Sequence, residues 1–164
     1  MSVQKRTRRM IGQVVEIDLG DGLKAYGRVL EEPLLAFYDK QVRDGVPPPL
    51  AEVADWPVAF KIWVMNHAVT KGRWKVIGSL PLSADMQVRP GFFKQDAMNG
   101  RLSIYDYDAA PSYERPASRA ECEPLECAAV WDPEHVEDRL RDHFAGRPNK
   151  WTESLRIRPA SDWT

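Results

Sequence analysis

Apolar and polar residues alternate along residues 11–29, a pattern typical of paired strands. Gly20-Asp21-Gly22 interrupts the alternation with residues that favour a tight turn. We therefore predict a hairpin, with Lys24, Tyr26 and Arg28 on the outward, polar face of its second strand. Gly27 stands in the middle of that strand, which predicts a bend or a close backbone approach.

Further apolar runs predict more strands. Residues 34–38 form a third strand, and residues 58–64 and 74–80 alternate on either side of a turn at Lys71-Gly72, which predicts a second hairpin. Short strands are expected at residues 102–107 and 154–158. Residues 40–57 contain three consecutive prolines and predict a long surface connection with one or two helical turns before Trp56-Pro57.

The clearest helix is predicted over residues 133–145. Asp132 can cap the free amides, Pro133 suits the first helical position, and Gly146 ends the pattern. Val136, Leu140 and Phe144 recur at helical spacing and form an apolar stripe.

These elements predict a single α+β domain over residues 11–158. We expect a twisted, mainly antiparallel sheet that could curl into a partial barrel, with the long helix packed on it. Residues 1–10 carry basic side chains without periodicity and predict a flexible tail, and residues 159–164 predict a C-terminal tail.

Composition narrows the function classes. The chain has 164 residues with 23 Lys and Arg against 24 Asp and Glu, so its net charge of −1 argues against a general polyanion binder. No apolar run is long enough to span a membrane, and the basic start lacks the apolar centre of a signal peptide. We therefore expect a cytoplasmic protein without a membrane partner.

The sequence gives little support for catalysis or metal binding. Cys122, Cys127, His135 and His143 miss the spacing of zinc-binding motifs, so no metal and no cofactor are expected. His67 has no nucleophile motif near it, and we predict that the chain is not an enzyme. His135, Asp138 and Asp142 share one helix face, where the density of charge, including Glu137 and Arg141, indicates a solvated surface.

Two binding functions remain open. A sheet face with Lys24, Tyr26, Arg28, Lys61 and Trp63 could stack bases and hold phosphates, which is the nucleic-acid alternative.

The other function is protein binding. Eight acids stand against two arginines between residues 121 and 146, and Tyr105, Asp106, Tyr107 and Asp108 alternate just upstream. Aromatic anchors beside acids suit a cationic protein partner. The same acids could instead serve the helix dipole and solubility.

Several strings together resemble one known family. These are residues 20–29, 60–65 (FKIWVM), 72–78 (GRWKVIG), 92–96 (FFKQD) and 129–137 (AVWDPEHVE). In order and spacing they resemble the immunity protein 26 family of bacterial polymorphic toxin systems, over about residues 11–157.

The resemblance implies a cytoplasmic antidote that binds a cognate toxin domain, such as a nuclease, and blocks it without catalysis. For this role we assign Tyr105, Asp106, Tyr107, Asp108, Glu121, Glu123 and Glu126 as candidate partner-binding residues. The acidic stretch 121–142 would then act as a decoy for a cationic toxin site.

Overall fold

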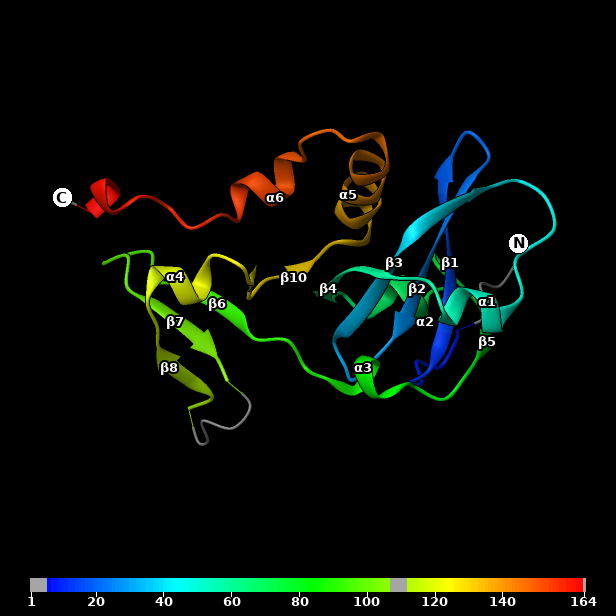
Figure 1. Ribbon diagram of the computed structural model, residues 1–164, viewed down its shortest axis with the longest axis horizontal. Helices are drawn as coiled ribbons and strands as arrows, with labels where there is room; N and C mark the ends of the chain where they lie inside the picture. The colour runs from blue at the N-terminus through cyan, green and yellow to red at the C-terminus, as the bar shows by residue number, and fades with distance from the viewer. Residues whose placement is uncertain (1–5, 107–111, 164) are drawn as a thin grey trace. The chain divides into compact units, whose positions relative to one another are not determined.

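The computed structural model describes residues 6–106 and 112–163, which form two compact units (Figure 1). Unit 1 contains the described residues up to Val88 together with Val130–Asn149, and unit 2 contains Arg89–Ala129 and the described residues from Lys150 onward. The predicted α+β class is confirmed. The strands belong to two mainly antiparallel sheets, neither of which closes into a barrel in the described part of the chain.

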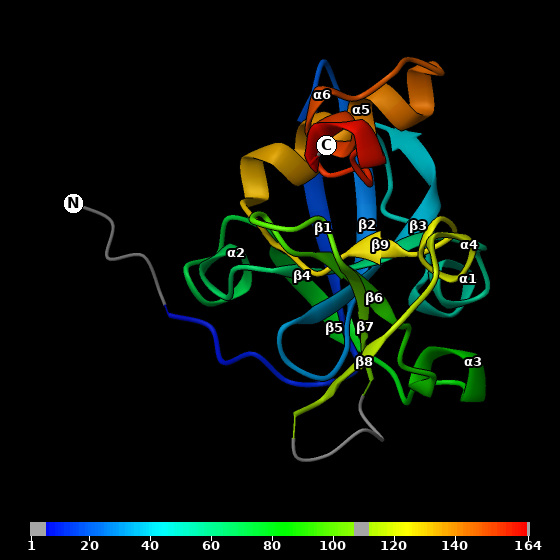
Figure 2. The same cartoon turned by 90° about the vertical axis from the view of Figure 1, so that its left-hand side faces the viewer.

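Unit 1 is built on a six-stranded sheet with the order β10-β4-β3-β2-β1-β5. Its strands are β1 (Gln13–Gly20), β2 (Leu23–Val29), β3 (Leu34–Arg43), β4 (Val58–Val64), β5 (Lys75–Ser79) and β10 (Val130–Trp131). The predicted first hairpin and third strand are confirmed, because β1, β2 and β3 lie side by side and pair antiparallel (Figure 2). Gly27 provides the predicted close approach, since a Cβ there would lie 3.2 Å from the carbonyl oxygen of Ala36.

The predicted second hairpin is wrong in its pairing. β4 pairs with β3 and with β10, whereas β5 pairs with β1 near the other edge of the sheet. Between β4 and β5 lies the short helix α2 (His67–Thr70), in which Ala68 and Val69 are buried. The residues between β4 and β5 therefore form a packed connection in place of the predicted hairpin turn.

Helix α5 (Pro133–Ala145) covers one face of this sheet, with the bounds that the sequence predicts. The amide of Glu134 donates to the Asp132 side chain at 2.9 Å, and Gly146 ends the helix at a φ of +68°. Val136 and Leu140 are fully buried, and α5 contacts β1 and β3. Val136 and Leu140 of the predicted stripe therefore attach the helix to the sheet, whereas Phe144 is only half-buried.

The other face is covered by α1 (Leu50–Ala54) and α3 (Ala84–Gln87). Leu50 packs against Gly78 of β5, and the Trp56 ring meets Tyr26 edge-on with 5.7 Å between centroids. Lys61 of β4 donates to the carbonyl oxygens of Asp85 and Val88 at the end of α3. The sheet is thus enclosed on both faces.

This covering makes the predicted outward row wrong for Tyr26 and Arg28, which are 1% and 2% exposed. The Arg28 guanidinium donates to the carbonyl oxygens of Gly12 at 2.8 Å and Leu80 at 2.5 Å. It also donates to the Tyr38 hydroxyl at 3.2 Å. Arg28 therefore fastens the chain before β1 to the chain after β5.

Residues 7–10 fall in the predicted flexible tail, yet they make specific contacts with unit 1. The Thr7 amide donates to the Thr70 carbonyl at 2.9 Å, and the Arg9 guanidinium donates to the Leu34 carbonyl at 2.9 Å. The Gln13 amide group donates to the Arg8 carbonyl. These residues belong to the packing of unit 1.

Unit 2 is built on a four-stranded sheet with the order β8-β7-β6-β9. Its elements are β6 (Phe92–Gln95), β7 (Leu102–Tyr105), β8 (Glu114–Pro116), α4 (Arg119–Cys122), β9 (Glu126–Cys127), α6 (Lys150–Ser154) and a 3-10 helix (Ala160–Trp163). Phe93, Ile104 and Cys122 form its buried cluster, against which Ile157 packs.

The predicted strand over residues 154–158 is wrong. Helix α6 ends at Ser154, and the chain after it is held by a side chain rather than by a strand. Gln95 accepts from the Arg158 amide at 2.8 Å and donates to the Arg158 carbonyl at 3.2 Å. Ser161 to Trp163 lie in the predicted C-terminal tail, and the Trp163 indole donates to the Ala97 carbonyl at 3.2 Å.

We expect Leu140→Ala to lower the free energy of unfolding by about 2–5 kcal/mol, because it leaves a cavity between α5 and the sheet. Val46→Ala is the control, since Val46 is 96% exposed. Urea unfolding followed by tryptophan fluorescence measures both. Equal stability of the two variants would contradict the packing of α5 described above.

Candidate protein-binding site

Three of the predicted partner-binding residues gather near Arg115 of β8. The Arg115 guanidinium lies 3.4 Å from the Asp106 carboxylate and 3.2 Å from the Glu121 carboxylate. Tyr105 is the neighbour of Asp106 and the last residue of β7, which pairs with β8. Tyr105 and Glu121 are 16 residues apart in the sequence. Strand pairing brings them close to each other, together with α4, which lies beside β7 (Figure 1).

A capping box on α4 positions Glu121. The Glu121 amide donates to the Ser118 hydroxyl at 3.2 Å, and the Ser118 amide donates to the Glu121 carboxylate at 2.8 Å. This bond from the Ser118 backbone, together with Arg115, holds the pKa of Glu121 below its usual value. Ser118 and Arg115 therefore fix the orientation of the Glu121 side chain and favour its carboxylate form.

Tyr105 is held by residues that the sequence interpretation missed. Its ring stacks on Tyr113 with 6.2 Å between centroids, and the Lys94 ammonium lies 5.4 Å from the Tyr105 ring centre. Lys94 also pairs with Glu114 at 2.5 Å. Tyr113, Glu114 and Arg115 are adjacent in the sequence, but only the register of β7 with β8 brings them to Tyr105.

The remaining predicted residues do not join this cluster. Glu126 lies in β9, at the opposite edge of the sheet from β8, and Glu123 is exposed at the C-terminal end of α4. Tyr107 and Asp108 lie outside the described residues. We define the Arg115 cluster as Lys94, Tyr105, Asp106, Tyr113, Glu114, Arg115 and Glu121.

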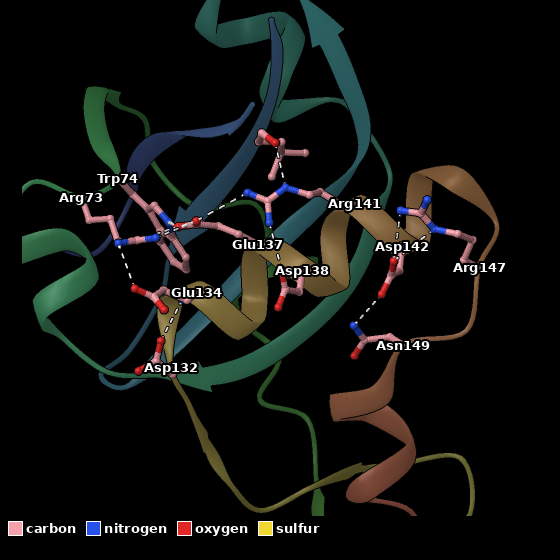
Figure 3. Close-up of polar contacts among 11 residues, drawn as sticks. Arg73, Trp74, Asp132, Glu134, Glu137, Asp138, Arg141, Asp142, Arg147 and Asn149 are labelled. Atoms are coloured by element: carbon pink, nitrogen blue, oxygen red, sulfur yellow. Dashed lines mark hydrogen bonds and ion pairs between the residues drawn. The ribbon is translucent and has the colours of Figure 1, made fainter. Parts of the chain in front are cut away.

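A second polar network lies on α5 in unit 1 (Figure 3). The Glu137 carboxylate accepts from the Arg73 guanidinium at 2.7 and 2.9 Å and from the Trp74 indole at 2.9 Å. Glu137 is only 6% exposed, so its predicted place on a solvated face is wrong. The many charged residues around Glu137 in the sequence gave no indication that this acid is buried. The residues that could have indicated it are its donors Arg73 and Trp74, which stand 64 and 63 residues upstream.

The other acids of α5 also have partners within unit 1. Glu134 lies 3.6 Å from Arg73, and Asp138 lies 3.0 Å from Arg141, whose Nε donates to the Leu19 carbonyl (Figure 3). Asp142 accepts from Arg147 and from Asn149. The predicted acidic stretch 121–142 is therefore divided between two units, and its α5 part is largely neutralised by arginines.

The basic and aromatic face predicted for nucleic acid is not assembled. Tyr26 and Arg28 are buried, Lys24 pairs with Asp18 at 3.3 Å, and Lys61 is held by α3 carbonyls. Trp63 lies half-buried in β4. None of these observations favours nucleic-acid binding.

The structure also shows where the side chains considered for metal binding and catalysis lie. Cys122 and Cys127 lie in unit 2 and His143 lies in unit 1, where its Nε2 is 2.6 Å from the Asp39 carboxylate. Among residues 6–106 and 112–163, no three His, Cys, Asp or Glu side chains group as metal ligands would. Burial raises the pKa of both cysteine thiols, which disfavours the reactive thiolate.

Comparison with known proteins gives one match. The model of the family described as Immunity protein 26 matches residues 10–104, more than half of the chain. No curated protein and no solved structure matches. The matched residues run from the start of unit 1 to β7 of unit 2, so α5 and most of the Arg115 cluster lie beyond them. No helix among the described residues has the length and apolar character needed to cross a membrane.

We expect Glu137→Ala to destabilise the protein by about 1–3 kcal/mol, because it leaves the buried Trp74 indole without an acceptor. Glu134→Ala removes a side chain that is 70% exposed, and we expect it to change stability by less than about 0.5 kcal/mol. Urea unfolding compares the two. Similar losses in both variants would contradict a special role for Glu137.

We expect Arg115→Ala to raise the pKa of Glu121 toward its ordinary value, because one of the two groups that favour the carboxylate is lost. Since the folded pKa is lowered, this carboxylate stabilises the fold above its unfolded pKa, and the contribution is lost as the pH falls through the folded pKa. Carboxyl-detected NMR titration of both proteins measures the change. An unchanged Glu121 pKa would show that Arg115 does not hold it.

Proposed function

The chain belongs to the immunity protein 26 family, and we propose that it binds a toxin domain and blocks it by occlusion, without catalysis. The toxin would be encoded beside it in a bacterial polymorphic toxin system, and a nuclease is the class we expect. The proposal places the protein in the cytoplasm, where such a toxin acts.

The Arg115 cluster is the observation that carries this proposal. Tyrosine and arginine are the residue types that contribute most to protein interfaces. Tyr105 and Arg115 are each held by neighbours before any partner arrives, so little side-chain entropy would be lost on binding. All seven predicted partner-binding residues also lie beyond residue 104, where the family match ends. A surface outside the matched part can differ between members and set the choice of toxin.

An antidote must occupy nearly all of its toxin, which requires a dissociation constant of nanomolar or below, or about 12 kcal/mol. The stacked tyrosines and Arg115 would supply the anchors. The exposed Glu123 and the nearby Glu126 would speed the encounter with a cationic toxin surface. The decoy role proposed for acids in this chain is thereby limited to unit 2, since the acids of α5 are paired.

The first test is co-expression with the toxin domain encoded by the neighbouring gene. We expect the two proteins to purify as one complex and the cells to survive. For Tyr105→Ala we expect at least about tenfold weaker binding by calorimetry, because a stacked anchor is removed. Val46→Ala is the matched truncation of an exposed side chain. Cell death despite co-expression, with no complex, would refute the proposed function.

We expect Glu123→Lys combined with Glu126→Lys to slow association severalfold at low salt, and the difference to shrink at high salt. Glu121 is left intact because it caps α4. The control reverses two exposed acids of unit 1, Glu52→Lys with Asp55→Lys. Surface plasmon resonance at two salt concentrations measures the rates. Equal association rates for both double variants would contradict steering by unit 2.

A further inference from the structure

One face of the unit 2 sheet carries a pocket of about 470 Å³. Lys94, Ser103 and Pro116 stand in register across β6, β7 and β8, so their side chains share a face. Phe93 and Ile104 point to the opposite face, where the buried cluster with Cys122 and Ile157 lies. The pocket therefore lies on the face of the sheet that the unit 2 core does not use.

The wall of the pocket is charged, and its acids are already engaged. Glu114 pairs with Lys94. The Asp96 carboxylate accepts from the amides of Met98 at 2.7 Å and Asn99 at 3.1 Å, which fixes the turn between β6 and β7. Among the described residues, neither of these two acids forms an ion pair with Arg101.

Arg101 differs from these acids, because its side chain has no polar partner among the described residues. It lines the same pocket, and its side chain is exposed. Across residues 6–106 and 112–163, no hydrogen bond or ion pair engages its guanidinium. Arg101 directly precedes β7, and its carbonyl accepts from the Asp96 amide at 2.9 Å, which continues the pairing of β6 with β7 by one residue. Because Arg101 and Ser103 are two residues apart, both side chains lie on the pocket face. A guanidinium and a hydroxyl at the same pocket are donors for one incoming acceptor.

We propose that this pocket binds a single carboxylate, with Arg101 as its charge partner and Ser103 as a second donor. Arginine binds carboxylates through two parallel hydrogen bonds, which gives the contact direction as well as charge. We expect a phosphate dianion to fit less well, because its tetrahedral group does not match the planar, two-bond geometry in which a guanidinium binds a carboxylate and because Asp96 in the wall repels two charges more than one. The source we propose for the carboxylate is an Asp or Glu side chain of the toxin domain. Only this source rests on the proposed function.

NMR titration of the full chain tests the pocket without any toxin. The probes are N-acetyl-glutamate methylamide, its glutamine counterpart and inorganic phosphate. We expect the Arg101 Nε–H signal to shift saturably with the glutamate probe, and at least about tenfold less affinity for the other two. Arg101→Gln should abolish the saturable response at Ser103, whereas Arg156→Gln, another exposed arginine of unit 2, should keep it. No Arg101 shift, or equal shifts with the glutamine probe or phosphate, would overturn the proposal.

Binding to the toxin domain tests the source of the carboxylate. We expect Arg101→Glu to weaken the complex at least about tenfold, and Arg43→Glu, an exposed arginine of unit 1, to leave it unchanged. A complex that forms equally well with Arg101→Glu overturns the assignment to the toxin. If the unaltered protein does not bind the toxin at all, the proposed function fails, and the probe titration still decides the chemistry of the pocket.

Discussion

One buried carboxylate ties α5 to the core of unit 1, beside the apolar contacts of Val136 and Leu140 that attach the helix to the sheet. A carboxylate removed from water must be matched by donors, and Glu137 finds them in Arg73 and Trp74. Trp74 also contacts Phe37 of β3 edge-on, so the acid joins the helix to the centre of the core. Because α5 follows the first segment of unit 2 in the chain, unit 1 is completed only when the segment from Val130 onward returns to it. The core of unit 1 thus includes α5, which lies outside the residues that the family model matches.

The same arginines that stabilise α5 remove most of its outward charge. Paired charges of opposite sign give a field that decays rapidly, so a helix rich in acids need not attract a distant cation. This explains why a strongly negative stretch of sequence gives no strongly negative helix surface. In the function we propose, acids outside these pairs would therefore steer the partner by charge, and the aromatic and arginine side chains that the fold holds in place would give specific recognition.

Features encoded locally could be predicted from the sequence, and features that depend on distant segments could not. The bounds of α5 follow from Asp132, Pro133 and Gly146, which act within one turn of the helix. Alternation placed Tyr26 and Arg28 on the correct face of β2, but it carries no information about α1 and α3, which cover that face. Leu155 and Ile157 alternate like a strand, although Ile157 packs into a cluster instead of pairing.

The candidate site shows the same division. Tyr105, Asp106 and Glu121 could be chosen from the sequence because acids and aromatics concentrate there. Arg115, which holds both acids, could not be chosen, because its place depends on the register of β7 with β8. Glu137 was missed for a related reason: helical spacing alone does not distinguish a buried acid from a solvated one when its donors lie more than 60 residues away.

The edge of the unit 2 sheet limits how a partner can bind beside the Arg115 cluster. The Tyr113 carbonyl and the Ala117 amide bond to β7, so the amide and carbonyl of Glu114 point away from it. Both are engaged by the Ser112 hydroxyl, at 3.4 and 3.2 Å, and Pro116 has no amide hydrogen to offer. An added strand would find few free groups at this edge. A toxin bound at this end of unit 2, as we propose, would therefore be recognised by side chains, which distinguish one protein from another far better than backbone pairing does.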